Sequence, residues 1–112
     1  MASFTRTGTL AGTDTLDTIV FTVDLPADIT YTVTAKGGGD NRLRVRCGQQ
    51  LIAIWAQIHD FYIEPGQSAT RSFQTDIDGT TPTTDRKQDV RIRLSRDILT
   101  KEIDWELKVT VS

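Results

Sequence analysis

The sequence predicts an all-β domain, an antiparallel β-sandwich or jelly roll of about eight short strands. The first observation behind this prediction is composition. Thr, Ile and Val make up close to a third of the 112 residues, with 18, ten and seven copies, and β-branched side chains fit a pleated sheet better than a helix. The second is that apolar and polar residues alternate with a period of two in short stretches, which Gly, Pro and Asp turns separate.

The alternation predicts the individual strands. In chain order they cover residues 4–10, 19–25, 29–35, 43–47, 68–74, 90–94 and 105–111. Pro26 and Gly48 are expected to end the second and the fourth of them. Glu64-Pro65-Gly66-Gln67 is typical of a type II turn, because Pro presets the first central φ and Gly accepts a positive φ at the second. The polar segment 76–88 is expected to form the longest exposed loop.

Residues 51–62 fit two patterns. Leu51, Ile54, Trp55, Ile58 and Phe61 match a helical stripe, but the three isoleucines, the tryptophan and the lack of an N-cap favour a strand. Such a strand would be apolar on both faces, with Ile52, Ile54 and Ile58 on one side and Leu51, Ala53, Trp55 and Phe61 on the other. A sandwich covers only one face of each sheet, so the second face needs a loop, the N-terminal arm or another chain. We therefore expect an interface or ligand platform at Leu51, Ala53, Trp55, Phe61 and Tyr62.

Length and charge exclude several classes of protein. A chain of 112 residues is expected to form a single domain, residues 1–112. Its net charge of −2 argues against a nucleic-acid partner. The longest apolar run is the six residues 51–56, far short of the roughly 18 residues of a membrane span. No signal peptide is visible at the start, so we expect a cytoplasmic or particle-associated protein, or a mature form behind an expression Met.

Catalytic and metal-binding constellations are scarce. His59 and Cys47 are the single histidine and cysteine; we interpret the first as a strand-end neighbour of Asp60 and the second as a small buried hydrophobe. Gly37-Gly38-Gly39 leads into a strand and is expected to be a turn. Asp76-Ile77-Asp78-Gly79 has acidic spacing, but it lacks the later ligands of a calcium loop. We expect no enzyme, no metal and no cofactor.

Two rows of arginines form a second candidate site. Arg42, Arg44 and Arg46 share one face of a predicted strand, and Arg91 and Arg93 share one face of another. If these strands are neighbours, the five guanidinium groups form an anion patch for a sulfated glycan, a phosphate or an acidic protein surface. The alternative is an ordinary surface, in which Asp104 and Glu106 on the last strand pair with Arg91 and Arg93.

Three stretches of the chain form a pattern that is known from one family. The chain opens with Thr7-Gly8-Thr9-Leu10-Ala11-Gly12-Thr13-Asp14 followed by Val20-Phe21-Thr22-Val23, continues at residues 29–45 with a hydrophobic strand, a Gly-Asp turn and a further strand, and closes with Asp104-Trp105-Glu106-Leu107-Lys108-Val109-Thr110-Val111. These stretches resemble the first strands, the middle strands and the closing strand of the bacterial pre-peptidase C-terminal domain, a small β-sandwich appended to secreted proteases and other extracellular enzymes. The resemblance implies a sandwich that attaches to polysaccharide or matrix.

One departure concerns calcium. The family carries several aspartates at the turn where this chain has Asp40-Asn41-Arg42-Leu43-Arg44, and fixed cations beside the turn disfavour a divalent metal. Two functions therefore stay open. The first is a non-catalytic structural or interaction protein that self-associates or docks on a larger assembly such as a phage or virion particle. The second is a carbohydrate- or matrix-binding module, with Trp55 and Tyr62 as its platform.

Overall fold

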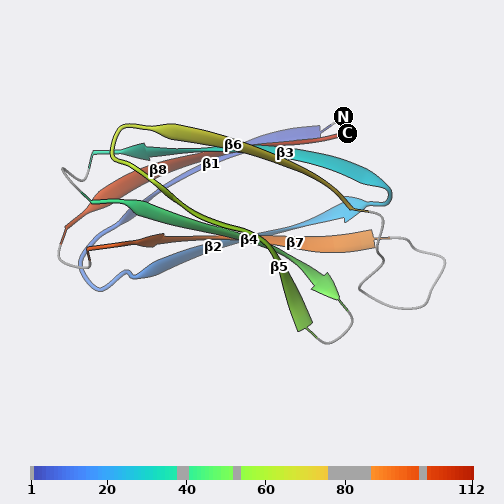
Figure 1. Cartoon of the computed structure of the whole chain (residues 1–112), viewed down its shortest axis with the longest axis horizontal. Coiled ribbons are helices and arrows are strands. Elements are labelled where there is room, and N and C mark those ends of the chain that lie inside the picture. The colour runs from blue at the N-terminus through green and yellow to red at the C-terminus, as the bar shows by residue number, and fades with distance from the viewer. Residues whose placement is uncertain (1, 38–40, 52–53, 76–86, 99–100) are drawn as a thin grey trace.

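The computed structural model describes residues 2–37, 41–51, 54–75, 87–98 and 101–112. The secondary structure in these ranges consists of strands (Figure 1): β1 (Ala2–Leu10), β2 (Leu16–Asp24), β3 (Ala27–Lys36), β4 (Leu43–Leu51), β5 (Ile54–Ile63), β6 (Ser68–Thr75), β7 (Lys87–Arg96) and β8 (Ile103–Val111). Over the same ranges, no helix is long and apolar enough to cross a membrane.

The strands form two layers, as Figure 1 shows. Sheet A has the order β1-β8-β3-β6 and sheet B the order β2-β7-β4-β5, and neighbouring strands in both sheets are antiparallel. Consecutive strands mostly alternate between the sheets, so the hydrogen-bonded partners come from distant parts of the chain. This is the topology of a jelly roll. The predicted all-β sandwich of about eight short strands is confirmed.

The core fills the space between the sheets. Tyr31 is fully buried and Trp105 is 5% exposed, as their positions on inward stripes predict. They pack among aliphatic side chains from both sheets, including Ile29, Leu43 and Ile92. The expected turn at Glu64–Gln67 is also present: Gly66 has a φ of 79°, and the Gln67 amide donates to the Glu64 carbonyl at 3.0 Å.

The prediction that Gly48 ends its strand is wrong. β4 continues to Leu51, and its register with β5 shifts between Cys47 and Gly48. Cys47 is opposite His59 and Gly48 is opposite Gln57, so Ile58 is the extra residue of a β-bulge. A side chain added at Gly48 would lie 3.1 Å from the Ala56 carbonyl oxygen. The bulge thus brings the two backbones close together, and glycine is the residue that allows this.

The bulge also changes the faces predicted for residues 51–62. The preference for a strand holds for β5, but the extra residue reverses the alternation along it. Trp55 pairs with Gln50 and Tyr62 pairs with Arg44, so both aromatic residues face away from sheet A. Phe61 instead faces the core side, and its predicted grouping with Trp55 is wrong. Ala53 and the side chain of Leu51 lie outside the described residues.

The predicted loop 76–88 is shorter at its C-terminal end. Residues 76–86, with the acidic segment Asp76–Gly79, lie outside the described residues. Lys87 and Gln88 already belong to β7. Gln88 is fully buried, and its amide donates to the Gln50 carbonyl. The prediction that Gln88 belongs to an exposed loop is therefore wrong, because the Gln88 side chain lies on the inward face of β7.

Candidate interaction surface

The two strands that carry the predicted arginines are hydrogen-bonded neighbours. Arg46 on β4 is directly opposite Arg93 on β7, and Gly48 is opposite Arg91. On the other side of β4, Arg44 pairs with Tyr62 and Arg46 with Asp60. Residues at these positions share the outer face of sheet B, which points away from sheet A. The arginine rows and two aromatic residues of the predicted platform, Trp55 and Tyr62, are thus parts of one surface, which we call the outer face of sheet B.

Arginine side chains stack on both aromatic rings of this face. The Arg91 guanidinium lies 4.3 Å from the centre of the Trp55 ring, and it reaches that ring across Gly48, which has no side chain. The Arg42 guanidinium lies 4.3 Å and that of Arg44 5.9 Å from the centre of the Tyr62 ring. Such stacking of a cation on a ring face holds long side chains in place at a surface.

Two of the five arginines have carboxylate partners. Arg44 holds Asp60 with both ends of its guanidinium group: Nε donates to Oδ1 at 2.9 Å and Nη2 to Oδ2 at 2.7 Å. These hydrogen bonds lower the pKa of Asp60. Arg42 pairs with Asp97 through Nη2 at 3.0 Å. Pairs this exposed contribute little to stability, but they fix the geometry of the face.

The other three arginines, Arg46, Arg91 and Arg93, have no ion pair within the described part of the chain. Asp60 faces Arg46 in the register, but both of its oxygens are taken by Arg44. Partial burial lowers the pKa of Arg46, and the charges of Arg93 and Arg44 lower it further. Burial and the charges of Arg91 and Arg44 act in the same way on the pKa of Arg93. Arg46 and Arg93 thus lie among like charges, and Asp60 is the opposing charge that acts on both.

The predicted neutralisation by Asp104 and Glu106 is wrong. Both residues are on β8, which belongs to sheet A and not to the sheet that carries the arginines. There Glu106 pairs with Lys36 at 3.0 Å, and Asp104 accepts a hydrogen bond from Thr9 at 2.7 Å. The strand order that separates these carboxylates from Arg91 and Arg93 follows from the long-range pairing of the jelly roll, which strand alternation alone does not specify.

The outer faces of the two sheets differ in chemistry. Sheet A presents cross-strand hydroxyl pairs, Thr30 with Ser72, Thr32 with Thr70 and Thr34 with Ser68. Sheet B presents, beside the arginines, the exposed side chains of Leu16 (43%), Val20 (52%) and Tyr62 (45%). Leu16 and Val20 were not among the predicted site residues. The sequence does contain a signal for them: Leu16 and Val20 are apolar residues at solvent-facing positions of a strand whose other face is buried.

Phe61, His59 and Cys47 lie on the core side of sheet B. Phe61 packs against the core and lies under the Arg71 guanidinium, which is 4.2 Å from the ring centre. The Nδ1 atom of His59 is hydrogen-bonded to the Tyr31 hydroxyl at 2.8 Å. Burial raises the pKa of the Cys47 thiol to about 12, so the thiolate, which is the reactive form, is not populated at neutral pH.

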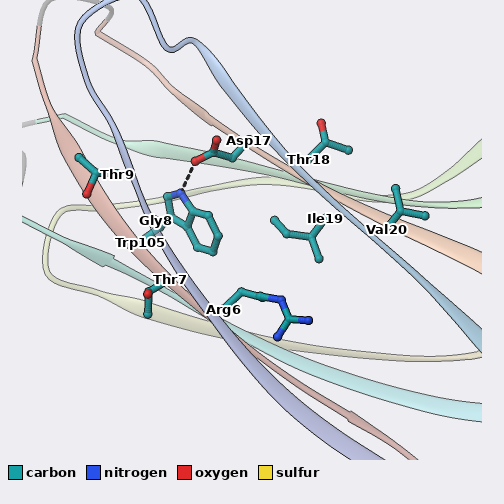
Figure 2. A pocket seen from close by; sticks show the side chains of 9 residues that line it. All are labelled: Arg6, Thr7, Gly8, Thr9, Asp17, Thr18, Ile19, Val20 and Trp105. Carbon is teal, nitrogen blue, oxygen red and sulfur yellow. Dashed lines mark hydrogen bonds between the residues drawn. The ribbon is translucent and has the colours of Figure 1, made fainter.

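A groove lies between β1 and β2, the edge strands of the two sheets. Its volume is about 540 Å³, and Figure 2 shows Arg6 and Asp17 on its opposite walls. The Trp105 indole lies beneath Gly8 and donates to Asp17 Oδ2 at 2.7 Å. Sequence reasoning missed this groove, because its two walls are brought together only by the packing of the sheets. Trp105 is nearly buried, so its ring face is not open to a ligand.

The turn before β4 is held without acidic residues in its described part. Asn41 is fully buried; its amide nitrogen donates to the carbonyls of Ile98 at 3.0 Å and Lys101 at 2.8 Å, and its amide oxygen accepts from the Ile98 amide at 2.7 Å. Asp40 lies outside the described residues. Asn41 therefore anchors the segment after β7 with its side chain. Within the described ranges there is no group of three or more His, Cys, Asp or Glu side chains arranged to hold a metal ion.

No protein-family model matches the sequence, and no curated protein is a significant match. Solved structures do match. The pre-peptidase C-terminal domain of a collagenase from Bacillus anthracis has a TM-score of 0.59 and 17% identity, over 96% of this chain and 88% of that domain. A chain in the structure of Broad Bean Stain Virus has a TM-score of 0.53 and 11% identity, over 100% of this chain and 86% of that one. At these identities the comparisons show the fold alone: the chain shares the β-sandwich of a pre-peptidase C-terminal domain, and the predicted resemblance is confirmed at that level.

Proposed function

We propose that this protein is a non-catalytic interaction domain that associates through the outer face of sheet B. One observation carries the proposal: Leu16, Val20 and Tyr62 are each more than 40% exposed on this face, beside arginines stacked on aromatic rings. Arg, Tyr and Trp are the residues that dominate binding energy at protein interfaces. The polar outer face of sheet A has no such composition.

A second copy of the chain is the partner that the charges favour. Six of the 13 basic residues, the five arginines and Lys87, lie on this face together with Asp24, Asp60, Asp89 and Asp97. The remaining seven basic residues (13 − 6) are outnumbered by 11 acidic ones (15 − 4), so the rest of the molecule is net acidic. Two copies joined face to face would bring the same arginines together, which is unfavourable. A head-to-tail contact, with the outer face of sheet B against an acidic surface of the next copy, avoids this repulsion. Contacts of that kind build rings or larger assemblies.

Sedimentation velocity from low micromolar to sub-millimolar concentration tests the proposal. The wild type should sediment as a species heavier than its 12.5 kDa monomer, and Val20→Glu should return it to the monomer, because it places a negative charge against the acidic surface of the next copy. Thr30→Glu is the matched control, because it adds the same charge to an exposed position on the outer face of sheet A. A wild type that stays monomeric throughout, or equal losses of association in both variants, would contradict association through this face.

A second candidate function is a carbohydrate- or matrix-binding module. It is favoured by one observation, that Trp55 and Tyr62 are on the same face, each beside an arginine. Aromatic rings with nearby polar groups are suited to sugar rings. A glycan array with wild type and Trp55→Ala tests it: signals that depend on Trp55 support the module, and silence across neutral and sulfated sugars removes it.

A further inference from the structure

We propose that Arg46, Arg91 and Arg93 form a binding site for an oxyanion group at the centre of the outer face of sheet B. The inference rests on the proposed function in one respect, that this face is the contact surface, and it adds the chemistry that the face recognises. The group is a carboxylate, a sulfate or a phosphate, whether it is free in solution or part of a second copy of the chain.

The first argument is an unsatisfied donor. The Nε atom of Arg46 is buried and has no hydrogen-bond partner among the described residues. A buried N–H group without an acceptor is costly, and in native proteins such groups are rare. The carboxylate nearest in register, Asp60, is held by Arg44 and is not free to accept from Arg46. A bound group would satisfy this donor once the Arg46 side chain turns Nε toward the surface, because the atom is enclosed in the unbound face.

The second argument is the concentration of like charge. Arg46 and Arg93 are directly opposed across the β4–β7 ladder, and Arg91 follows at the next outward position of β7. Like charges in opposed positions destabilise a sheet. Partial burial lowers the pKa values of Arg46 and Arg93, and neighbouring arginines lower them further: Arg93 and Arg44 act on Arg46, and Arg91 and Arg44 act on Arg93, while Asp60 acts in the opposite direction on both. A bound anion would relieve the repulsion, so the arrangement is more favourable with a ligand than without one.

The third argument is preorganisation. Arg91 is stacked on Trp55, and Arg44 is fixed by its two hydrogen bonds to Asp60 at one side of Arg46. Each guanidinium group presents several N–H donors in a plane, and these match the paired oxygens of carboxylate, sulfate and phosphate. Side chains already held by neighbours lose less conformational freedom when a ligand binds.

Titration calorimetry with sodium sulfate and with sodium phosphate, each against chloride at matched ionic strength, tests this site. The wild type should bind the oxyanions and not chloride. Arg46→Gln and Arg93→Gln should each weaken binding about tenfold or more, the usual effect of losing a charged hydrogen bond. Arg42→Gln is the matched control on the same face: it removes the same charge from an arginine that already has a carboxylate partner, and it should change the affinity less than about threefold.

The site is overturned if the wild type shows no oxyanion binding beyond chloride, or if the three variants weaken binding equally. Sedimentation of the same samples separates this result from the proposed function. Sulfate that binds and also dissociates the assembly identifies a carboxylate of the second copy as the natural occupant. Sulfate that binds to a protein that is always monomeric supports the site and contradicts self-association. An assembly that forms while sulfate neither binds nor dissociates it contradicts the site alone.

Discussion

Gly8→Ala tests how closely β1 is packed over the core. A Cβ atom at position 8 would lie 2.5 Å from Cζ2 and 2.7 Å from Cε2 of the Trp105 indole. Both distances are far inside van der Waals contact, and the ring is held from below by the core. The indole would have to move, and its hydrogen bond to Asp17, 2.7 Å in the wild type, would be strained or lost (Figure 2).

The expected cost follows from three contributions. Overpacking a well-packed core costs about 1–3 kcal/mol, and loss of a hydrogen bond to a charged group costs about 1.5–3 kcal/mol. Replacing Gly by Ala by itself raises the free energy of unfolding by about 0.4–1 kcal/mol, because it restricts the conformations of the unfolded chain. The free energy of unfolding should therefore fall by about 3 kcal/mol, which for a domain of this size lowers Tm by roughly 12 °C.

Urea unfolding followed by far-UV circular dichroism measures this cost, in the wild-type background and in Trp105→Phe. Phenylalanine lacks the second ring that carries Cζ2, the atom nearest to the new methyl group, so Gly8→Ala should cost clearly less in the second background, by about 1 kcal/mol or more. Thr7→Ala, an exposed change on the same strand, is the control. A cost below about 0.5 kcal/mol in the wild type, or the same cost in both backgrounds, would refute the packing argument.

Three further predictions concern charge. Burial, and after it the charge of Arg71, lowers the pKa of His59 below its usual 6.5, so the unfolded state takes up a proton at a higher pH than the folded state does. The stabilisation from neutral His59 is complete above the pKa of the unfolded state and is lost as the pH falls through the pKa of the folded state. Thermal unfolding should therefore show a Tm that declines from about pH 7.5 to about pH 5, and His59→Gln should flatten this decline. Arg93→Gln should raise the free energy of unfolding by about 0.5 kcal/mol at low salt, because it removes one of two opposed like charges, while it weakens oxyanion binding. If the increase in the free energy of unfolding does not shrink in high salt, repulsion is not its cause. Asp60→Asn should tighten sulfate binding about threefold in calorimetry, because it removes a negative charge beside Arg46 and frees Arg44; unchanged or weaker binding would show that Asp60 does not compete for these arginines.

The alternation of apolar and polar residues was sufficient to predict most of the strands, their buried faces and a β-sandwich. Period-two patterns such as that of Ile29, Tyr31 and Val33 predict both a strand and its buried face, because side chains along a strand point to opposite sides in turn. Trp105 and Tyr31 were placed in the core for the same reason, and both are buried. The pattern failed at Gly48, since a bulge adds one residue and reverses every face beyond it.

What the sequence determined by itself was which residues form strands, and that arginines share a face on two of them. Which strands are neighbours was decided by tertiary structure. The jelly-roll order puts β7 beside β4 and assigns Asp104 and Glu106 to the other sheet, so Arg46, Arg91 and Arg93 have no carboxylate partner in the described part of the chain. It was likewise the bulge at Ile58 that put Trp55 on their side. Strand pairing depends on contacts between residues far apart in the chain, and local alternation holds no information about which distant strands will meet.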